Sequence, residues 1–252
     1  MEASGPSLPT PQGSLPPEQV HRLLETGEIT DCRLLPEGSN YVFLTRVVGA
    51  DGAVCLGIYK PQSGERPLWD FPPGTLYLRE CASYVVSQAI GWDFVPYTTV
   101  REGPHGIGAL QQFIASQPGQ SYFTLQERHQ GQLWRMAVFD LFANNADRKG
   151  GHCLLDDQDK LWGIYHGLTF NVDQKLRTVI WDFCGHTIPE PLLGDLRRLQ
   201  DLLGKPSDLA RRLGDLLDND EVECLQDRLQ ALLSNPVHPY LHPRWNRPWP
   251  LM

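Results

Sequence analysis

The change of hydrophobic period along the chain is the feature that most constrains its fold. Up to about residue 115, short apolar runs of strand length are separated by turn sequences such as A-D-G, and beyond it longer segments of helical period dominate. The strand candidates are 29–35, 41–48, 53–60, 97–101 and 107–114, with a helix over 75–90 between them. Amphipathic segments at 131–144 and from about 184 to 234 predict helices. This order predicts an α+β fold in which a small antiparallel sheet precedes a mostly helical part.

The length of the chain sets its organisation. A chain of 252 residues corresponds to one domain or to two closely packed lobes. Residues 1–17 contain five prolines and few apolar side chains, which predicts a disordered lead-in. We expect an N-terminal lobe over 18–115 and a C-terminal lobe over 116–252. The last 18 residues carry five prolines and two tryptophans, which is typical of an extended tail draped over the surface.

Composition excludes several classes of function. Lys and Arg total 22 against 30 Asp and Glu, a formal charge of -8, which disfavours nucleic acid and an anionic membrane surface as partners. No apolar run approaches the ~20 residues of a membrane-spanning helix, and no secretory signal is visible. The six cysteines form no C-x-x-C pair, so we expect reduced thiols and a cytoplasmic protein.

Three features of the N-terminal part have the chemistry of a phosphate site. Gly38, Ser39 and Asn40 lie between two predicted strands, where small residues let backbone N–H groups approach a phosphate. Lys60 ends an apolar strand, and Glu80 on the following helix could hold it in place, as a strand lysine and a helix glutamate do in kinases. Taken singly, each has a plainer interpretation: an ordinary turn, a solvated strand end and a surface helix residue.

The run N-N-A-D-R-K-G-G-H at 144–152 is the strongest of these features. Asp147 in this polar loop could orient a hydroxyl nucleophile and accept its proton. Arg148 or Lys149 could stabilise charge on a transferring phosphoryl group. His152 lies five residues beyond Asp147, where a kinase loop places a metal ligand. The alternative is a charged turn between a helix and a strand, but the order of all four features favours an enzyme.

Longer motifs carry a resemblance to a known family. The stretch beginning Y-K-P at 59 and ending R-E at 80, then G-W-D-F-V-P, N-N-A-D-R-K-G-G-H and H-G-L-T-F, resembles a bacterial family of uncharacterised phosphatidylinositol 3- and 4-kinase-like proteins. The resemblance covers roughly residues 27–235. More distantly, the order of the lobes resembles lipid kinases and a bacterial toxin-type serine kinase. The resemblance implies a two-lobed protein-kinase-like fold with ATP, and Mg or Mn, in the cleft.

The resemblance also implies roles for particular residues. Gly38, Ser39 and Asn40 would cover the phosphates, while Lys60 would contact them and pair with Glu80. The hinge that meets the adenine would be the stretch Gln111, Gln112, Phe113 and Ile114. In the C-terminal lobe Asp147 would be the catalytic aspartate, His152 the first metal position, and the residue before His166-Gly167 the second.

That second metal position departs from the family pattern. Relatives are expected to carry Asp there, whereas this chain has Tyr165. Magnesium prefers hard, charged oxygen ligands, and a phenol with a pKa near ~10 is neutral at pH 7. Three rescues are open: Asp182 could reach the metal, manganese could replace magnesium, or nucleotide binding could persist without turnover.

Three functional hypotheses follow. The leading one is an ATP-dependent phosphotransferase whose acceptor hydroxyl belongs to a protein or a small molecule rather than a lipid, because the chain is acidic and lacks a basic amphipathic helix. The second is a nucleotide-binding pseudokinase that acts as a switch or scaffold, which Tyr165 motivates. The third is an interaction module stabilised by zinc bound to His152-Cys153 and Cys184-Gly185-His186, although neither pair has the usual ligand spacing.

Overall fold

The computed structural model describes residues 15–36 and 38–252. The predicted disordered lead-in, 1–17, therefore lies mostly outside the described residues, and helix α1 (Pro17–Thr26) begins at its last position. Within the described part of the chain, no helix has the length and apolar character needed to cross a membrane. All six cysteines are free thiols.

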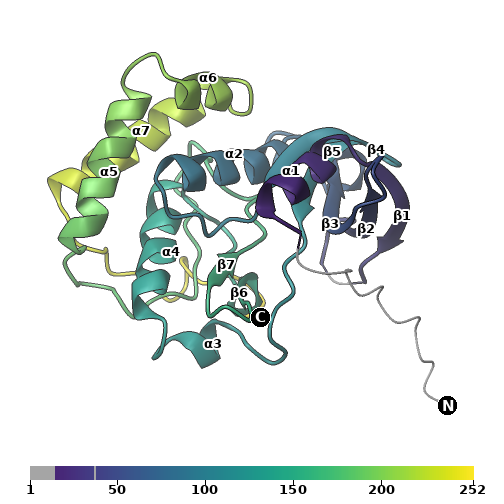
Figure 1. Cartoon of the computed structure of the whole chain (residues 1–252). Helices are drawn as coiled ribbons and strands as arrows, with labels where there is room; N and C mark the ends of the chain where they lie inside the picture. Colours follow the sequence, from purple (N-terminus) through teal and green to yellow (C-terminus); the bar gives the residue numbers. More distant parts are fainter. Residues whose placement is uncertain (1–14, 37) are drawn as a thin grey trace.

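An antiparallel sheet forms the N-terminal part. Its strands are β1 (Glu28–Leu34), β2 (Phe43–Val48), β3 (Val54–Pro61), β4 (Thr98–Gly103) and β5 (Gly106–Gln112), in the spatial order β1-β2-β3-β5-β4 (Figure 1). Each neighbouring pair is antiparallel, so the predicted meander and its turns are confirmed. Because β3 pairs with β5 in antiparallel fashion, Lys60 and Pro61 at the end of β3 lie beside Ala109 and Gly108 near the start of β5.

Two helices pack on this sheet. Helix α1 buries Leu23 and Leu24 against Val47 and Tyr59, and it ends at Gly27 as the sequence predicts. Helix α2 (Leu76–Ala89) follows the short 3₁₀ turn η1 (Gln62–Gly64) and lies between the sheet and the helical part (Figure 1). It is buried along most of its length because both parts of the molecule pack against it.

The remaining elements build the C-terminal part around the main apolar core. They are α3 (Tyr122–Leu125), α4 (Gln130–Phe142), the 3₁₀ turn η2 (Gly150–His152), the hairpin of β6 (Cys153–Leu155) and β7 (Leu161–Gly163), α5 (Glu190–Leu203), α6 (Asp208–Gly214) and α7 (Asn219–Ser234). The helical run is interrupted at 204–207 and 215–218, and the stretch 177–183 is a loop. The architecture confirms the predicted α+β class. The expected boundary near 115 falls in the link between β5 and α3, and the division into two folding units stays a prediction.

The tail follows the predicted extended course over the surface, and most of its residues are exposed. It returns from α7 toward β6 and β7, where the C-terminal end lies (Figure 1). His238 is fully buried and Leu251 packs against the main core. Backbone hydrogen bonds to the loops at 150, 178 and 186 hold it there. The tail is therefore held at a few points, such as His238 and Leu251, whereas Tyr240, Trp245 and Trp249 are exposed.

A buried ion pair joins α2 to α7, and it generates a stability prediction. Arg79 is 1% exposed, its guanidinium pairs with Glu221, and it also donates to the carbonyl of Thr169 at 3.2 Å. Glu221→Ala leaves the arginine buried without its counter-charge, so we expect a loss of about 3–5 kcal/mol in the free energy of unfolding. The exposed neighbour Glu223→Ala should change it by no more than about 0.5 kcal/mol. Urea unfolding of both variants checks this, and equal effects would contradict it.

Candidate functional site

Two adjoining cavities lie between the sheet and the helical part. The first has a volume of about 560 Å³ and the second about 470 Å³. Both are in the usual size range of ligand pockets. Lys60 and Tyr165 line both cavities, so these two side chains stand at the boundary between them.

Most of the predicted site residues line one cavity or the other. The first cavity is lined by Gly38, Ser39, Asn40, Lys60, Glu80, Asp147, Lys149, His152 and Tyr165. The second is lined by Gln111, Gln112, Phe113 and Ile114, together with Leu56, Ile58, Leu154 and Ile164. The fold therefore brings together residues more than 100 positions apart in the sequence. The second cavity is lined mainly by apolar side chains, whereas the charged side chains of the predicted site line the first.

The sheet and α2 position the cationic end of the site. Lys60 Nζ lies 2.8 Å from Glu80 Oε1 and 3.3 Å from Gln111 Oε1. Glu80 is 4% exposed, and its second oxygen, Oε2, has no hydrogen-bond partner among the described residues. Lys60 is thus held by two elements, β5 and α2, and a buried acceptor stands beside it.

The loop after α4 holds Asp147 at a fixed position. Asn145 donates from its side chain to Asp140 at 2.8 Å and accepts the backbone N–H of Asp147 at 3.0 Å. The flanking residues are tied by backbone bonds, Ala146 to Leu168 and Arg148 to Arg177. Asparagine suits such a loop because its side chain can satisfy backbone groups that leave a helix end. The sequence N-N-A-D therefore encodes the shape of the loop as well as its carboxylate.

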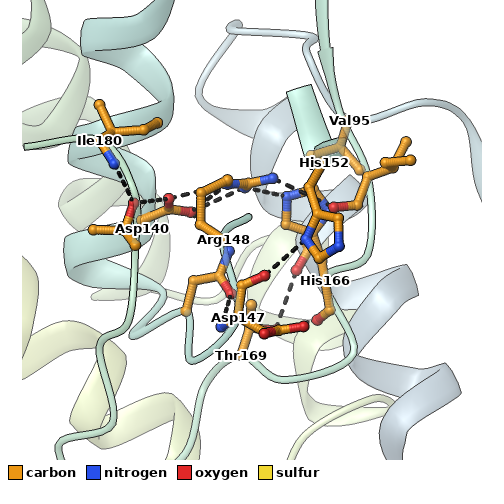
Figure 2. Close-up of polar contacts among 12 residues, drawn as sticks. Val95, Asp140, Asp147, Arg148, His152, His166, Thr169 and Ile180 are labelled. Atoms are coloured by element: carbon orange, nitrogen blue, oxygen red, sulfur yellow. Dashed lines mark hydrogen bonds and ion pairs between the residues drawn. The ribbon is translucent and has the colours of Figure 1, made fainter. Parts of the chain in front are cut away.

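The structure places Arg148 in the interior rather than in the cleft. Its side chain is fully buried, and its guanidinium makes a forked contact with Asp140, at 2.9 Å from Nη2 and 3.0 Å from Nε (Figure 2). Nη2 also donates to His166 Nε2 at 2.7 Å, and Nη1 to the carbonyl of Ile164 at 3.3 Å. Arg148 therefore forms a buried bidentate ion pair that holds the loop in place, and its charge does not face the cleft. Lys149 is the cation of this loop that lines the cleft.

Asp147 and Lys149 face the first cavity as a pair. Lys149 Nζ lies 3.2 Å from Asp147 Oδ2, and the Asp147 side chain is 25% exposed. Burial raises the pKa of Asp147 above its usual value, while Lys149 opposes that rise. A carboxyl with a raised pKa is a better proton acceptor for a hydroxyl than an ordinary one.

His152 and Tyr165 occupy the two positions where metal ligands are expected. His152 Nδ1 lies 2.7 Å from the carbonyl of Asp147, which can only accept, and 3.3 Å from the backbone N–H of Lys149. The shorter contact favours a proton on Nδ1 and the lone pair on Nε2. A ring oriented by a backbone carbonyl is the arrangement found in metal-binding histidines. Burial, with Arg148 and Lys149 nearby, lowers the pKa of His152 to about 3, so the ring is neutral. The Tyr165 ring lies 4.8 Å from the His152 ring and 4.8 Å from Lys60 Nζ, and Tyr165 has a φ of 59°.

Asp182 lies away from both cavities. It is exposed, and its carboxylate accepts a hydrogen bond from the Tyr122 hydroxyl. In the described ranges, no three or more His, Cys, Asp or Glu side chains gather in a way that could hold a metal ion. The structure thus offers His152 as the single predicted ligand with the right tautomer, and it brings neither Asp182 nor a zinc-type cluster to the cleft.

Sequence reasoning missed part of the cavity wall. Tyr41, Glu65 and Leu68 line the first cavity, and so do Trp249, Pro250 and Met252 from the tail. The long loop 61–74 was a signal for Glu65 and Leu68, since unstructured loops of that length are often functional. No local pattern connects the tail with a loop about 100 residues earlier.

The arrangement of sheet, helices and cleft is that of a two-lobed, protein-kinase-like protein. Structural similarity supports this class: the hydra Fam20 structure with sugar has a TM-score of 0.55 at 13% identity, covering 86% of this chain and 87% of that one. The Golgi casein kinase with Mn/ADP bound has a TM-score of 0.53 at 13% identity, covering 86% and 74%. Likeness at this level of identity establishes the fold.

Sequence similarity gives the family. The chain is 38% identical over 269 aligned positions to Protein Rv2133c of Mycobacterium tuberculosis, covering 92% of this chain and 95% of that protein. The chain belongs to the same family as Protein Rv2133c. No protein-family model matches the sequence.

The buried neutral imidazoles predict a pH dependence of stability. The pKa of His152 falls to about 3 and that of His166 lies well below 6.5 in the folded chain, whereas both titrate near ~6.5 when unfolded. Below pH 6.5 the unfolded state therefore binds more protons, and the free energy of unfolding falls as pH falls, by about 1.4 kcal/mol per pH unit for each imidazole. Above pH 6.5 this contribution is constant.

Urea unfolding between pH 7.5 and 5 measures this slope. His152→Gln should remove one imidazole's share of the slope, and the exposed His242→Gln should retain the parent slope. If His152→Gln leaves the slope of the unfolding free energy against pH unchanged, the prediction is wrong, and the folded chain already binds a proton at this ring.

Proposed function

We propose that the chain binds ATP in this cleft and transfers its γ-phosphoryl group to a hydroxyl of a protein or small molecule. The observation that carries the proposal is the Lys60–Glu80 ion pair, which faces Asp147 across one cavity while Lys60 also lines the slot formed by residues 111–116. A strand lysine held by a helix glutamate, opposite an aspartate in a loop, is the arrangement that kinases use to position phosphates and acceptor.

Each part of the cleft has a role in this proposal. The base lies in the slot against Phe113 and Ile114, and the phosphates lie beside Lys60 and the turn at 38–40. Gly38 has a φ of 102°, a conformation that glycine adopts without strain, so its backbone can approach a phosphate closely. Asp147 orients the acceptor hydroxyl and takes its proton, and Lys149 offsets the negative charge of the transferring group.

A metal ion would supply charge neutralisation and phosphate orientation when bound. His152 is the chain's own donor in place for it, and magnesium sites usually complete their shell with substrate phosphates and water. An imidazole suits transition metals better than magnesium. The Mn/ADP of the Golgi casein kinase belongs to a protein of the same fold, and we propose Mn or Mg with ATP here. The phosphatidylinositol-kinase class stays a proposal, with a non-lipid acceptor, and the cytoplasmic location stays a prediction.

Tyr165 favours a second candidate function, a nucleotide-binding pseudokinase. Its neutral phenol stands where a carboxylate is expected, between the two cavities and beside His152. Such a site can hold a nucleotide through Lys60 and the slot but lacks one charged anchor. Binding without turnover would make the cleft a switch or scaffold.

Nucleotide binding is tested first, by thermal unfolding with excess ATP. At a concentration about 100 times its dissociation constant, ATP stabilises the folded chain by ~2.7 kcal/mol, a rise of roughly 5–10 °C in Tm. Lys60→Ala should abolish the rise because the phosphates lose their cation. The exposed Lys205→Ala should keep it. No rise in the parent, with or without Mg²⁺ or Mn²⁺, would contradict both candidate functions.

Measurement of ADP release distinguishes the phosphotransferase from the pseudokinase. Tyr165→Asp restores a carboxylate at a backbone position with φ of 59°, which Asp and Asn tolerate better than most residues. We expect measurable ADP release by the parent and an increase of up to about 10²-fold in Tyr165→Asp with Mg²⁺. Tyr165→Asn is the uncharged control and should show no such increase. A parent that binds ATP but releases no ADP favours the pseudokinase.

A further inference from the structure

The segment 246–252 forms a fixed wall of the first cavity. At its start, Asn246 accepts the backbone N–H of Thr178 at 3.0 Å and donates from its side chain to the carbonyl of Leu176 at 2.8 Å. Near its end, the carbonyl of Leu251 accepts the N–H of Gly150 at 2.7 Å. Trp249, Pro250 and Met252 then line the cavity that contains Asp147.

The contact with the catalytic loop is close. A methyl group added at Gly150 would come within 2.6 Å of the Phe123 ring and 2.9 Å of Met252 Sδ. Gly150 is three residues beyond Asp147, so the tail packs directly on the loop that carries the carboxylate. Whatever occupies the cavity beside Asp147 therefore lies against tail side chains.

Among the described residues that line the first cavity, each lysine is already paired with a carboxylate. Lys60 pairs with Glu80, and Lys149 pairs with Asp147. In the proposed function Lys60 also contacts the nucleotide phosphates. Glu65 adds a further carboxyl group to the same wall. A second anionic group, such as the phosphate of an acceptor, would meet net negative charge here.

Exposed apolar side chains surround the opening of the first cavity. Tyr41, Trp249 and Met252 are 62%, 88% and 60% exposed, and all three line this one cavity. Leu68 and Pro250 lie in the same wall. Large apolar side chains gathered at one opening, rather than scattered over the surface, indicate a contact surface for an apolar ligand.

We propose that the acceptor is an uncharged alcohol or phenol with an apolar body, which lies against Trp249, Pro250 and Met252 with its hydroxyl at Asp147. This inference rests on the proposed phosphotransferase function. The acceptor oxygen forms a bond to the γ-phosphorus of ATP, the bond from that phosphorus to the β-bridging oxygen breaks, and ADP leaves. The hydroxyl proton passes to the carboxylate of Asp147.

Calorimetric titration of the full chain tests the acceptor class. The protein is first saturated with a non-hydrolysable ATP analogue, and its binding is measured. Three probes are then titrated: N-acetyl-tyrosinamide, N-acetyl-serinamide and myo-inositol 1-phosphate. We expect the phenol to bind most tightly, the small polar alcohol more weakly and the anionic polyol most weakly. Tightest binding by the inositol phosphate, or no binding of the phenol to the analogue-loaded chain, would overturn the proposal.

A pair of tail tryptophans provides the matched variants. Trp249→Ala should weaken binding of N-acetyl-tyrosinamide about three- to tenfold. Trp245→Ala, 63% exposed on the same tail but outside the cavity wall, should leave it unchanged. Binding of the ATP analogue reports that each variant is folded. If the parent and Trp249→Ala bind N-acetyl-tyrosinamide equally tightly, the proposed contact between the acceptor and the tail is wrong. Failure of the parent to bind the analogue would instead overturn the proposed function itself.

Discussion

The fully buried ion pair between Arg148 and Asp140 organises the C-terminal half of the cleft. It fastens the loop after α4 back onto α4, and the same guanidinium reaches His166 and the carbonyl of Ile164 on either side of Tyr165 (Figure 2). Two charges taken from water cost several kcal/mol each, so this geometry persists because each is satisfied by its partner. The loop of Asp147 and the strand end of Tyr165 are consequently held at a fixed separation, and the cleft depends on both.

Lys60 and Glu80 play the corresponding role in the N-terminal half. The lysine belongs to a central strand and the glutamate to a helix that both halves bury, so neither can move without disturbing the packing of the other. Oε2 of Glu80 is buried and has no hydrogen-bond partner among the described residues, and the ring of His152 nearby is neutral. Buried polar groups in folded proteins usually have a partner, so this oxygen is a group that a bound ligand or ion would satisfy. Tyr165 lies beside both Lys60 and His152, so in the proposed function it is the residue whose substitution separates turnover from binding alone.

Much of the fold follows from the sequence because its local signals agree. Turn residues separate the strands, and helix caps and glycine stops bound the helices, so element type and order are predictable. The Lys60–Glu80 pair was predicted from a lysine at a strand end and a glutamate on the next helix, and the family resemblance implies the same pair. The loop pattern predicts a cleft-facing cation at Arg148 or Lys149, and the structure has Lys149 there, because Arg148 is turned inward by a tertiary partner, Asp140, which a single sequence does not reveal. The tail wall was beyond prediction for the same reason, since Leu251 meets Gly150 across about a hundred residues.

Two adjacent residues of helix α2 point in different directions and form ion pairs with different partners. Glu80 points to the cleft and Lys60, while Arg79 is buried against Glu221 of α7 and the carbonyl of Thr169. Successive residues on a helix lie about 100° apart around its axis, so turning α2 far enough to withdraw Glu80 would tear Arg79 from its buried partners. A rotation of α2 about its axis would therefore break two ion pairs, one in the cleft and one in the core.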